Sequence, residues 1–419
     1  MMLSQLTTAE HTHELLAFAR GAALPTGGFG YLRSDGRVDT SVAVSTLITA
    51  RMTYCMSIAS VLASSPEGEA VRLRDEGAGI AEAAQLAEHG IRALSTLLRD
   101  TRNGGWVVDL GDEPDASDKR AYQTAFVVLA ASTASRAHVP GAERLLVDVL
   151  SAVETHFWSE RYGALIESWN ADWTVREPYW GANANMHGVE ALLAAHGATG
   201  DPLWLARATR IADTFIQQRA RANNWMLAEH FADDWTPLPD YNIERPDDQF
   251  RPFGVTIGHL FEWSRLLLEL GAAYPAGAAP AWLRECAEGL YATARRIGWS
   301  VDGAEGFVYT VDWVGEPVVR ERLHWVVAEA IGAAATLHSV TGQESYLVDL
   351  RSWQSYAARY LLDREQGSWY HTLDAKNRPT DAVWSGKPDV YHALQAVLLG
   401  DLPVGPTLFD RLVTLSRNE

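Results

Sequence analysis

Helical segments follow one another along almost the whole chain, and this succession limits the folds that the chain can adopt. Eleven Ala- and Leu-rich stretches, most of them roughly 12–20 residues long, have the apolar periodicity of helices. They are 41–63, 78–99, 119–136, 142–157, 183–197, 202–219, 255–271, 280–297, 323–341, 345–362 and 388–399. The connections are rich in Gly, Trp and Asp, which predicts loops or short hairpins. The chain is therefore expected to be all-α.

The spacing of chemically notable residues in these helices indicates a repeat. Arg51, His187, His259, Trp325 and His392 are separated by 136, 72, 66 and 67 residues, and the first interval is twice 68. Two helices and their connections fill a unit of about 68 residues, and 419 residues hold about six such units. Six helical hairpins that close into a ring form an (α/α)6 barrel. We predict one such domain over residues 1–419, with short β-hairpin or loop insertions at one rim. A coincidental spacing is the alternative.

Charge and cysteine content limit the partners. Acidic side chains number 53 against 35 basic ones, for a formal net charge of −18, which argues against nucleic acid and anionic membranes as partners. The two cysteines are 231 residues apart and indicate neither a disulfide framework nor a zinc site. The apolar stretches are too short or too interrupted to span a bilayer, and the N-terminus lacks the pattern of a secretory signal. We expect a cytoplasmic monomer or homodimer that binds a small molecule.

Two predicted helices are apolar on nearly all sides, at 260–270 and 324–335. Helices of this kind are usually surrounded by other helices. Ionisable residues nevertheless lie within or beside such inner helices, where burial is costly unless the residue is paired or takes part in chemistry. These residues are Arg51, His187, His259, Glu329 and His392.

Three of the histidines lie near the starts of their helices. His392 follows a proline suited to a first helical turn, and His187 and His259 follow glycines. If alternate helices run parallel as an inner ring, their starts meet at one rim. The three histidines and Arg51 would then line a single pocket. For Arg51 a structural ion pair is the alternative.

Spacing on single helices suggests partners for the histidines. Asn183, His187 and Glu190 form a polar stripe at steps of four and three residues. Glu262 follows His259 by three residues, so its carboxylate can raise the pKa of the imidazole and orient the ring. Ordinary structural pairing is the alternative in both cases.

Aromatic side chains and missing motifs bear on the chemistry. The chain has 16 tryptophans, several at predicted junctions of loops and helices, where flat faces suit the C–H faces of sugars. A core of large side chains accounts for most of them. No HExxH, Walker A or GxSxG motif is present, and no tight carboxylate–histidine cluster of the kind that a metal-dependent isomerase needs is evident. These absences favour chemistry without a metal or a cofactor.

Seven stretches resemble the N-acylglucosamine 2-epimerase superfamily. They are ITARMTY (48–54), WGANANMHGVEALLAA (180–195), AEHFADDWTPLPDYN (228–242), FRPFGVTIGHLFEWSRLLLEL (250–270), GFVYTVDW (306–313), RLHWVVAEAIGAA (322–334) and WSGKPDVYHALQA (384–396). Within that superfamily they are most similar to the D-mannose isomerase branch, near the bacterial aldose–ketose isomerases that include sulfoquinovose isomerase. The resemblance extends from about residue 25 to residue 400.

The resemblance implies an (α/α)6 barrel and metal-independent proton transfer at the carbon next to a sugar carbonyl. It implies His259 and His392 as a catalytic pair, with Glu262 beside the first and Arg51 as the arginine of the active site. Together with the spacing and the aromatic residues, it predicts further contacts to a monosaccharide substrate. These predicted contacts are His187, Asn183, Trp325, Glu329, Trp313 and Trp384.

The expected function is an aldose–ketose isomerase that interconverts D-mannose and D-fructose, or D-lyxose and D-xylulose, through a cis-enediolate. The 2-epimerase branches carry an aromatic residue shortly before the last histidine, whereas this chain has GKPDVYH with Trp384 further upstream, which favours an isomerase. A sugar 2-epimerase, a sulfoquinovose isomerase and a carbohydrate-binding scaffold are the alternatives. The sequence leaves open whether the segment 230–252 closes over the substrate.

Overall fold

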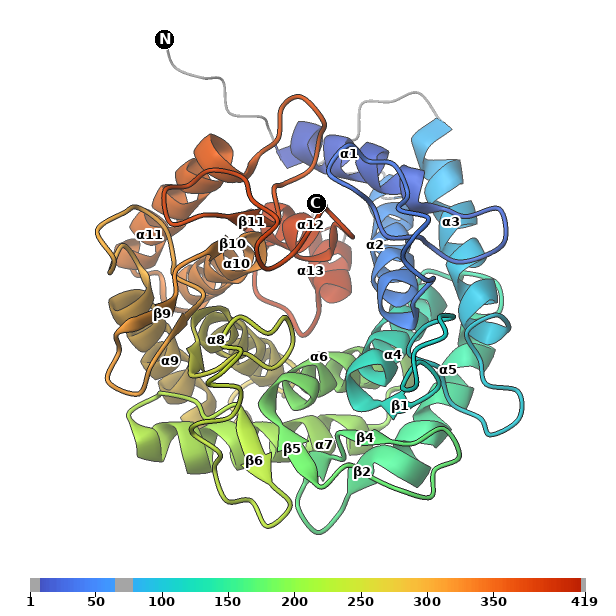
Figure 1. Ribbon diagram of the computed structural model, residues 1–419, viewed down its shortest axis with the longest axis horizontal. Coiled ribbons are helices and arrows are strands. Elements are labelled where there is room, and N and C mark those ends of the chain that lie inside the picture. Colours follow the sequence, from blue (N-terminus) through green and yellow to red (C-terminus); the bar gives the residue numbers. More distant parts are fainter. Residues whose placement is uncertain (1–7, 65–77, 416–419) are drawn as a thin grey trace.

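The helices of the chain form two concentric rings (Figure 1). The computed structural model describes residues 8–64 and 78–415. The inner ring consists of α2 (Thr46–Ser64), α4 (Ala121–Arg136), α6 (Ala182–Thr199), α8 (Ile257–Ala272), α10 (His324–Thr341) and α12 (Tyr391–Leu399). The outer helices are α3 (Ala78–Ser95), α5 (Ala142–Ala152), α7 (Pro202–Ala212), α9 (Trp282–Gly298) and α11 (Glu344–Tyr356). Each outer helix packs against the inner helix that precedes it, which confirms the predicted (α/α)6 barrel.

The sixth helix pair joins the two ends of the chain. α1 (Thr8–Ala19) packs against α12, and α12 contacts α2, so the ring closes there. α13 (Leu408–Leu415) packs against α2. Neither α1 nor α13 was among the predicted helices. The sequence of α1 is polar through most of its first half, and its buried residues are Thr12, Leu15, Leu16 and Ala19.

Burial distinguishes the two rings. Every residue of α10 from Val326 to Leu337 is buried, as expected for a helix enclosed on all sides. In α9 the buried residues recur every three or four positions along one face. The outer helices α5, α7 and α11 continue into π-helical stretches at Val153–Phe157, Asp213–Ala220 and Ala357–Leu361. None of the helices in the described residues is both long and apolar enough to cross a membrane.

Short strands lie where the inner helices begin. β1 (Lys119–Arg120), β5 (Tyr179–Gly181), β7 (Val255–Thr256) and β10 (Arg322–Leu323) each lead directly into an inner helix. Their antiparallel partners are, in the same order, β4 (Ser168–Trp169), β6 (His230–Ala232), β8 (Thr310–Val311) and β11 (Thr372–Leu373). β9 (Pro317–Val319) pairs with the other edge of β8 and adds a third strand to that sheet. β2 (Trp158–Ser159) pairs with β3 (Ala164–Leu165). These pairs bring distant loops to the same rim as the helix starts.

Candidate active site

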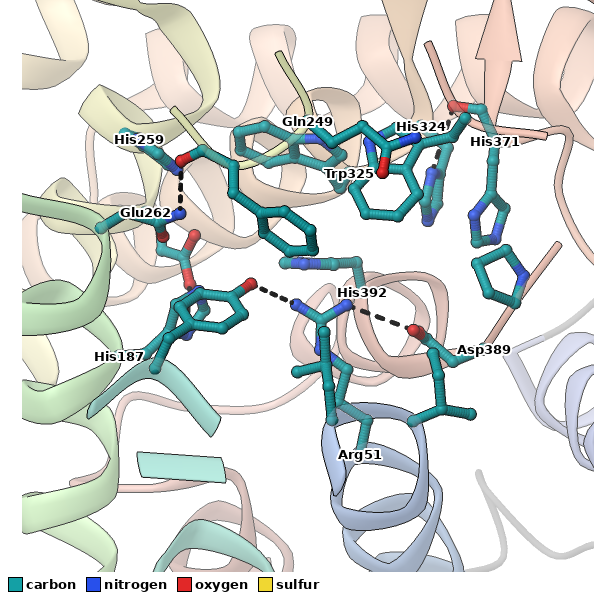
Figure 2. Close-up of a pocket in the computed structure, with 17 residues that line it drawn as sticks. Arg51, His187, Gln249, His259, Glu262, His324, Trp325, His371, Asp389 and His392 are labelled. Atoms are coloured by element: carbon teal, nitrogen blue, oxygen red, sulfur yellow. Dashed lines mark hydrogen bonds and ion pairs between the residues drawn. The ribbon is translucent and has the colours of Figure 1, made fainter. Parts of the chain in front are cut away.

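The starts of all six inner helices surround one pocket of about 600 Å³ (Figure 2). The residues that line it are Leu47, Ile48, Arg51, Tyr122, Asn183, His187, Gln249, Phe250, His259, Glu262, His324, Trp325, His371, Trp384, Pro388, Asp389 and His392. The structure therefore brings Arg51 and the three predicted histidines together.

His259 lies in the first turn of α8, and its ring has a carboxylate partner. Nδ1 is 3.0 Å from Oε1 of Glu229, whose side chain is buried. Glu229 directly precedes β6, and the pairing of β6 with β5 holds it near the barrel rim. Because Nδ1 faces this carboxylate, Nε2 is the nitrogen that remains for a substrate.

His392 lies in the first turn of α12 and makes an equivalent contact. Nδ1 is 2.9 Å from Oε1 of Glu329, and Oε2 of Glu329 accepts a hydrogen bond from Nε of Arg265 at 3.0 Å. Burial lowers the pKa of His392 well below its usual range, and the positive charge of Arg51 lowers it further. The ring is therefore a neutral imidazole at pH 7, the form that accepts a proton.

Trp325 lies beside both of these histidines. Its ring centroid is 5.2 Å from that of His259 and 5.8 Å from that of His392. Figure 2 shows the three side chains at the same pocket. Two imidazoles that are 133 residues apart in the chain thus face one space.

Arg51 is both paired and accessible to the pocket. Nη1 is 3.2 Å from Oδ2 of Asp389, and Nη2 donates a hydrogen bond to the hydroxyl of Tyr122 at 2.9 Å. Burial opposes the charge, but Tyr122 and Asp389 raise the pKa of Arg51 above its usual value. Arg51 therefore forms a structural ion pair and also lines the pocket, where it contributes a permanent positive charge.

Glu262 pairs with residues other than the expected one. Its Oε1 is 3.7 Å from Nδ1 of His187 and 3.6 Å from Nη2 of Arg265. The predicted carboxylate partner of His259 is thus corrected from Glu262 to Glu229. The physical reason is that the residue just before β6, Glu229, reaches His259 from outside α8, while Glu262 lies close to the guanidinium of Arg265 in the barrel interior.

Comparisons with known proteins bear on this geometry. Residues 27–396 match the N-acylglucosamine 2-epimerase (GlcNAc 2-epimerase) family. The chain belongs to this family. It is 46% identical over 403 residues to a D-mannose isomerase of Pseudomonas cannabina pv. alisalensis, with 96% of this chain and 93% of that protein covered. A D-mannose isomerase of Thermobifida fusca is also 46% identical, over 404 residues, with 96% and 95% covered.

Solved structures of similar proteins have the same architecture. A crystal structure of a D-mannose isomerase superposes with a TM-score of 0.84 at 29% identity, covering 95% of this chain and 97% of that one. A cellobiose 2-epimerase from Spirochaeta thermophila superposes at 0.76 with 21% identity, covering 98% and 96%, and shows the shared fold alone. This family member is therefore an isomerase, an enzyme of the sugar isomerase and epimerase class.

Four of the six predicted substrate contacts line the pocket, namely His187, Asn183, Trp325 and Trp384. Two do not. Glu329 lies behind His392 and contacts its Nδ1. Trp313 follows β8, and its Nε1 donates a hydrogen bond to the carbonyl of Pro239 at 3.0 Å. Trp313 is thus corrected from a sugar contact to a support of the segment 230–252, because β8 and β9 carry its ring to that loop.

A histidine pair that the sequence did not reveal lies at the other end of the pocket. The rings of His324 and His371 stack with centroids 3.7 Å apart, because the pairing of Leu323 with Thr372 places them side by side. Burial lowers the pKa of His324 to about 4 and that of His371 well below its usual range. This end of the pocket therefore carries two neutral rings.

The segment 230–252 forms part of the pocket wall. Nε2 of Gln249 donates a hydrogen bond to the carbonyl of Val383 at 2.6 Å. The ring of Phe250 meets that of Trp384 edge to face, with centroids 5.4 Å apart. These contacts connect the segment to the loop that precedes α12.

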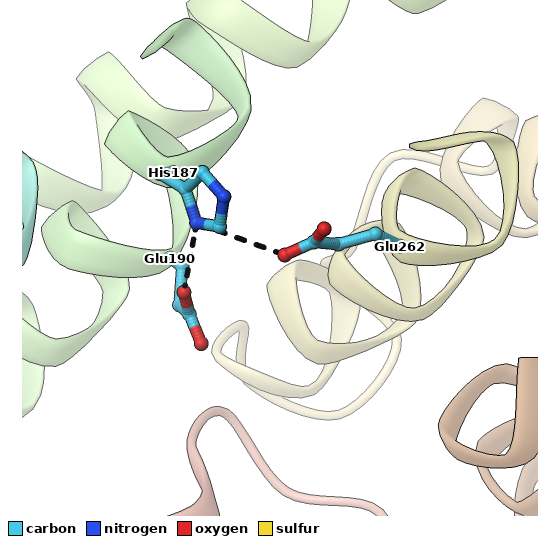
Figure 3. A group of neighbouring side chains, drawn as sticks. All are labelled: His187, Glu190 and Glu262. Atoms are coloured by element: carbon cyan, nitrogen blue, oxygen red, sulfur yellow. Dashed lines mark hydrogen bonds and ion pairs between the residues drawn. The ribbon is translucent and has the colours of Figure 1, made fainter. Parts of the chain in front are cut away.

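A carboxylate–histidine cluster that the sequence did not reveal lies at the base of the pocket (Figure 3). Ligand atoms of His187, Glu190 and Glu262, from α6 and α8, all lie within 4.8 Å of one another. The expectation that no tight cluster exists is thus corrected. However, Arg265 already brings a positive charge to Glu262. Burial and the charge of Glu329 also raise the pKa of Glu262 well above its usual range, which favours the neutral acid. A neutral acid beside a guanidinium makes this cluster a poor cation site.

Proposed function

We propose that this enzyme is a metal-independent aldose–ketose isomerase that interconverts D-mannose and D-fructose, with D-lyxose and D-xylulose as the alternative pair. The observation that carries the proposal is the meeting of His259 and His392 at one pocket beside Trp325. The D-mannose isomerases at 46% identity support this choice of sugar.

The chemistry requires a hydrogen to move between C2 and C1 of the linear sugar. His392, held neutral, removes the proton from C2. The electrons of that bond form the C1–C2 double bond, and the carbonyl electrons move onto O1, giving a cis-enediolate. His392 then returns the proton to C1 as the carbonyl forms at C2. His259 moves protons at O1 and O2 and assists ring opening.

Arg51 stabilises the intermediate in this scheme. Its guanidinium lines the same pocket and stays charged at all relevant pH values. A fixed cation next to a developing oxyanion lowers the barrier because no solvent has to reorganise around the new charge. Asp389 and Tyr122 hold the guanidinium in place.

A neutral sugar fits the pocket better than a sulfonated one. Arg51 is the only lysine or arginine side chain among the lining residues, and Asp389 already pairs with it. The opposite end carries the neutral rings of His324 and His371. A sulfonate would therefore be buried without a free cation to pair with it.

A product assay tests the proposal. Free mannose, lyxose, glucose and a sulfonated aldose are each incubated with the enzyme in the presence of a chelator, and the products are separated by chromatography. We expect fructose from mannose, with no loss of rate on addition of the chelator. Glucose as the product of mannose would show a 2-epimerase instead. Turnover of the sulfonated sugar alone would contradict the choice of substrate, and chelator-sensitive turnover would contradict metal independence.

A further inference from the structure

A second cavity, the side cavity, lies next to the active-site pocket. It has a volume of about 520 Å³, and Tyr122, Asn183 and Phe250 line both spaces. Arg120 and Arg251 also line it, and their side chains are 33% and 27% exposed. The side cavity therefore extends from the active site toward the protein surface.

Glu229 connects the side cavity to His259. Its Oε1 is 3.0 Å from Nδ1 of His259, and the residue lines the side cavity, whereas His259 lines the active-site pocket. Its Oε2 is buried and has no hydrogen-bond partner among residues 8–64 and 78–415. A buried carboxylate oxygen is costly to leave unpaired, and the side cavity that Glu229 lines has room for water.

The carboxylate behind His392 has different surroundings. Oε1 of Glu329 contacts His392, and Oε2 accepts from Arg265, whose Nε and Nη2 are both 3.0 Å away. Glu329 and Glu229 are 2% and 3% exposed, so the two carboxylates differ in their neighbours and not in their exposure. Arginine keeps its protons at all physiological pH values and so cannot pass one on. The contact with Arg265 therefore closes this pair to proton exchange.

We propose that the side cavity is the route by which protons reach and leave His259, with Glu229 as the relay between the imidazole and water, and that His392 has no such route. The inference rests on the proposed isomerase function. It gives the two histidines different roles. The open pair, His259 and Glu229, exchanges the protons of the sugar oxygens with solvent. The closed pair, His392 and Glu329, keeps the carbon-bound proton as it moves between C2 and C1.

The relay conserves protons at each step. Nε2 of His259 takes a proton from a sugar hydroxyl, while the proton on Nδ1 passes to Oε1 of Glu229. The carboxyl group then turns about its Cγ–Cδ bond, so that the protonated oxygen faces the side cavity, and gives that proton to water there. In the opposite direction, water protonates Glu229, Nδ1 is reprotonated, and Nε2 gives its proton to the sugar. No bond other than those to hydrogen changes.

Chemical rescue by formate tests the route. Glu229→Ala removes the relay and leaves a space beside the side cavity that a small carboxylate can occupy. We expect the kcat for mannose to fall by about 10²-fold, within the range for a lost acid–base group, and formate to restore it by about tenfold or more. Glu329→Ala should lose activity and respond less to formate than Glu229→Ala, because Glu329 lines neither the active-site pocket nor the side cavity. Chloride at the same ionic strength serves as the salt control.

Two conservative variants keep the test independent of folding defects. Glu229→Gln preserves volume and a hydrogen-bonding oxygen but cannot carry a proton. We expect it to remain impaired, to resist rescue, and to show a larger solvent deuterium isotope effect on kcat than the wild type. Glu177→Gln removes a carboxylate that pairs with Arg251 but contacts neither histidine, and it should keep the wild-type kcat.

The outcomes separate the two proposals. Wild-type kcat in Glu229→Gln, or no formate response in a folded Glu229→Ala protein, would overturn the relay while leaving the isomerase proposal intact. Equal rescue of Glu329→Ala would overturn the asymmetry between the two pairs. A wild-type enzyme without turnover of any free aldose would remove both proposals.

Discussion

The two histidine–glutamate pairs of this enzyme are almost identical in their inner contact and opposite in what lies behind it. His259 and Glu229 are 3.0 Å apart, and His392 and Glu329 are 2.9 Å apart. Glu229 lines a cavity that extends toward the surface, whereas Glu329 is held by a buried arginine. The comparison teaches that the role of a catalytic imidazole depends on the surroundings of its partner as well as on the partner itself.

The largest expected effect distinguishes the two histidines. His392→Ala should reduce kcat for mannose by about 10⁴-fold, because no base remains at C2, while His259→Ala should cost about 10²-fold, because water can replace part of an oxygen-bound proton transfer. Fructose formation measures the rates, and circular dichroism checks folding. His338→Ala, which changes a more exposed histidine at the end of α10, is the control. Equal losses in the two active-site variants would break the proposed division of labour.

Arg51 should affect the closed pair most directly. Arg51→Met should lower kcat by roughly 10²–10³-fold through loss of oxyanion stabilisation. It should also destabilise the fold by roughly 3–5 kcal/mol, because the buried Asp389 loses its partner. Adding Asp389→Asn should restore much of the melting temperature without restoring kcat, and removal of the cation should raise the pKa of His392. If the double variant recovers activity, Arg51 has only a structural role.

Retention of an isotope label tests whether the His392–Glu329 pair exchanges its proton with solvent. Mannose that carries deuterium at C2, converted in ordinary water, should give fructose in which part of the label remains at C1. A closed His392–Glu329 pair returns its proton before complete exchange with solvent. Mass spectrometry of early product measures the retained fraction. Complete loss of label would show that His392 exchanges freely, and complete retention, with no deuterium entering from heavy water, would indicate hydride transfer.

The smallest expected effect concerns pH. The pKa values of His324, His371 and His392 are lowered in the folded state, mainly by burial. The unfolded chain therefore binds more protons than the folded one below about pH 6.5, and stability falls as the pH decreases through this range toward about 4, the value for His324. Thermal melts between pH 7.5 and 4.5 measure the slope. His324→Asn should flatten it.

Much of the barrel could be predicted from local patterns. The eleven predicted helices are present because apolar periodicity reflects which side of a helix is buried. α1 was missed because only a few of its residues face the protein, and it completes the ring through α12, almost the whole chain length away. Its partner cannot be identified from spacing along the sequence.

The site was predictable only in part. The histidines could be placed at helix starts because prolines, glycines and helix periodicity are local signals. Glu229 could not be assigned to His259, because it lies 30 residues away and reaches the ring through strands of two or three residues. Glu262 was assigned wrongly because helix spacing allows it to pair with either His259 or Arg265 on α8, and only the structure shows that it lies near Arg265 and near His187 of α6.

Local patterns in the sequence specify the helices, the ring that these helices form and the residues whose chemistry the pocket contains. Local hydrogen bonding and burial of apolar faces decide these features, and both are written in short stretches of chain. Tertiary contacts alone show which carboxylate pairs with which imidazole. They also show that the carboxylate of Glu229 faces a cavity and that of Glu329 faces an arginine. Electrostatic interactions act through space between segments far apart in sequence, so their partners exist only once the ring has closed.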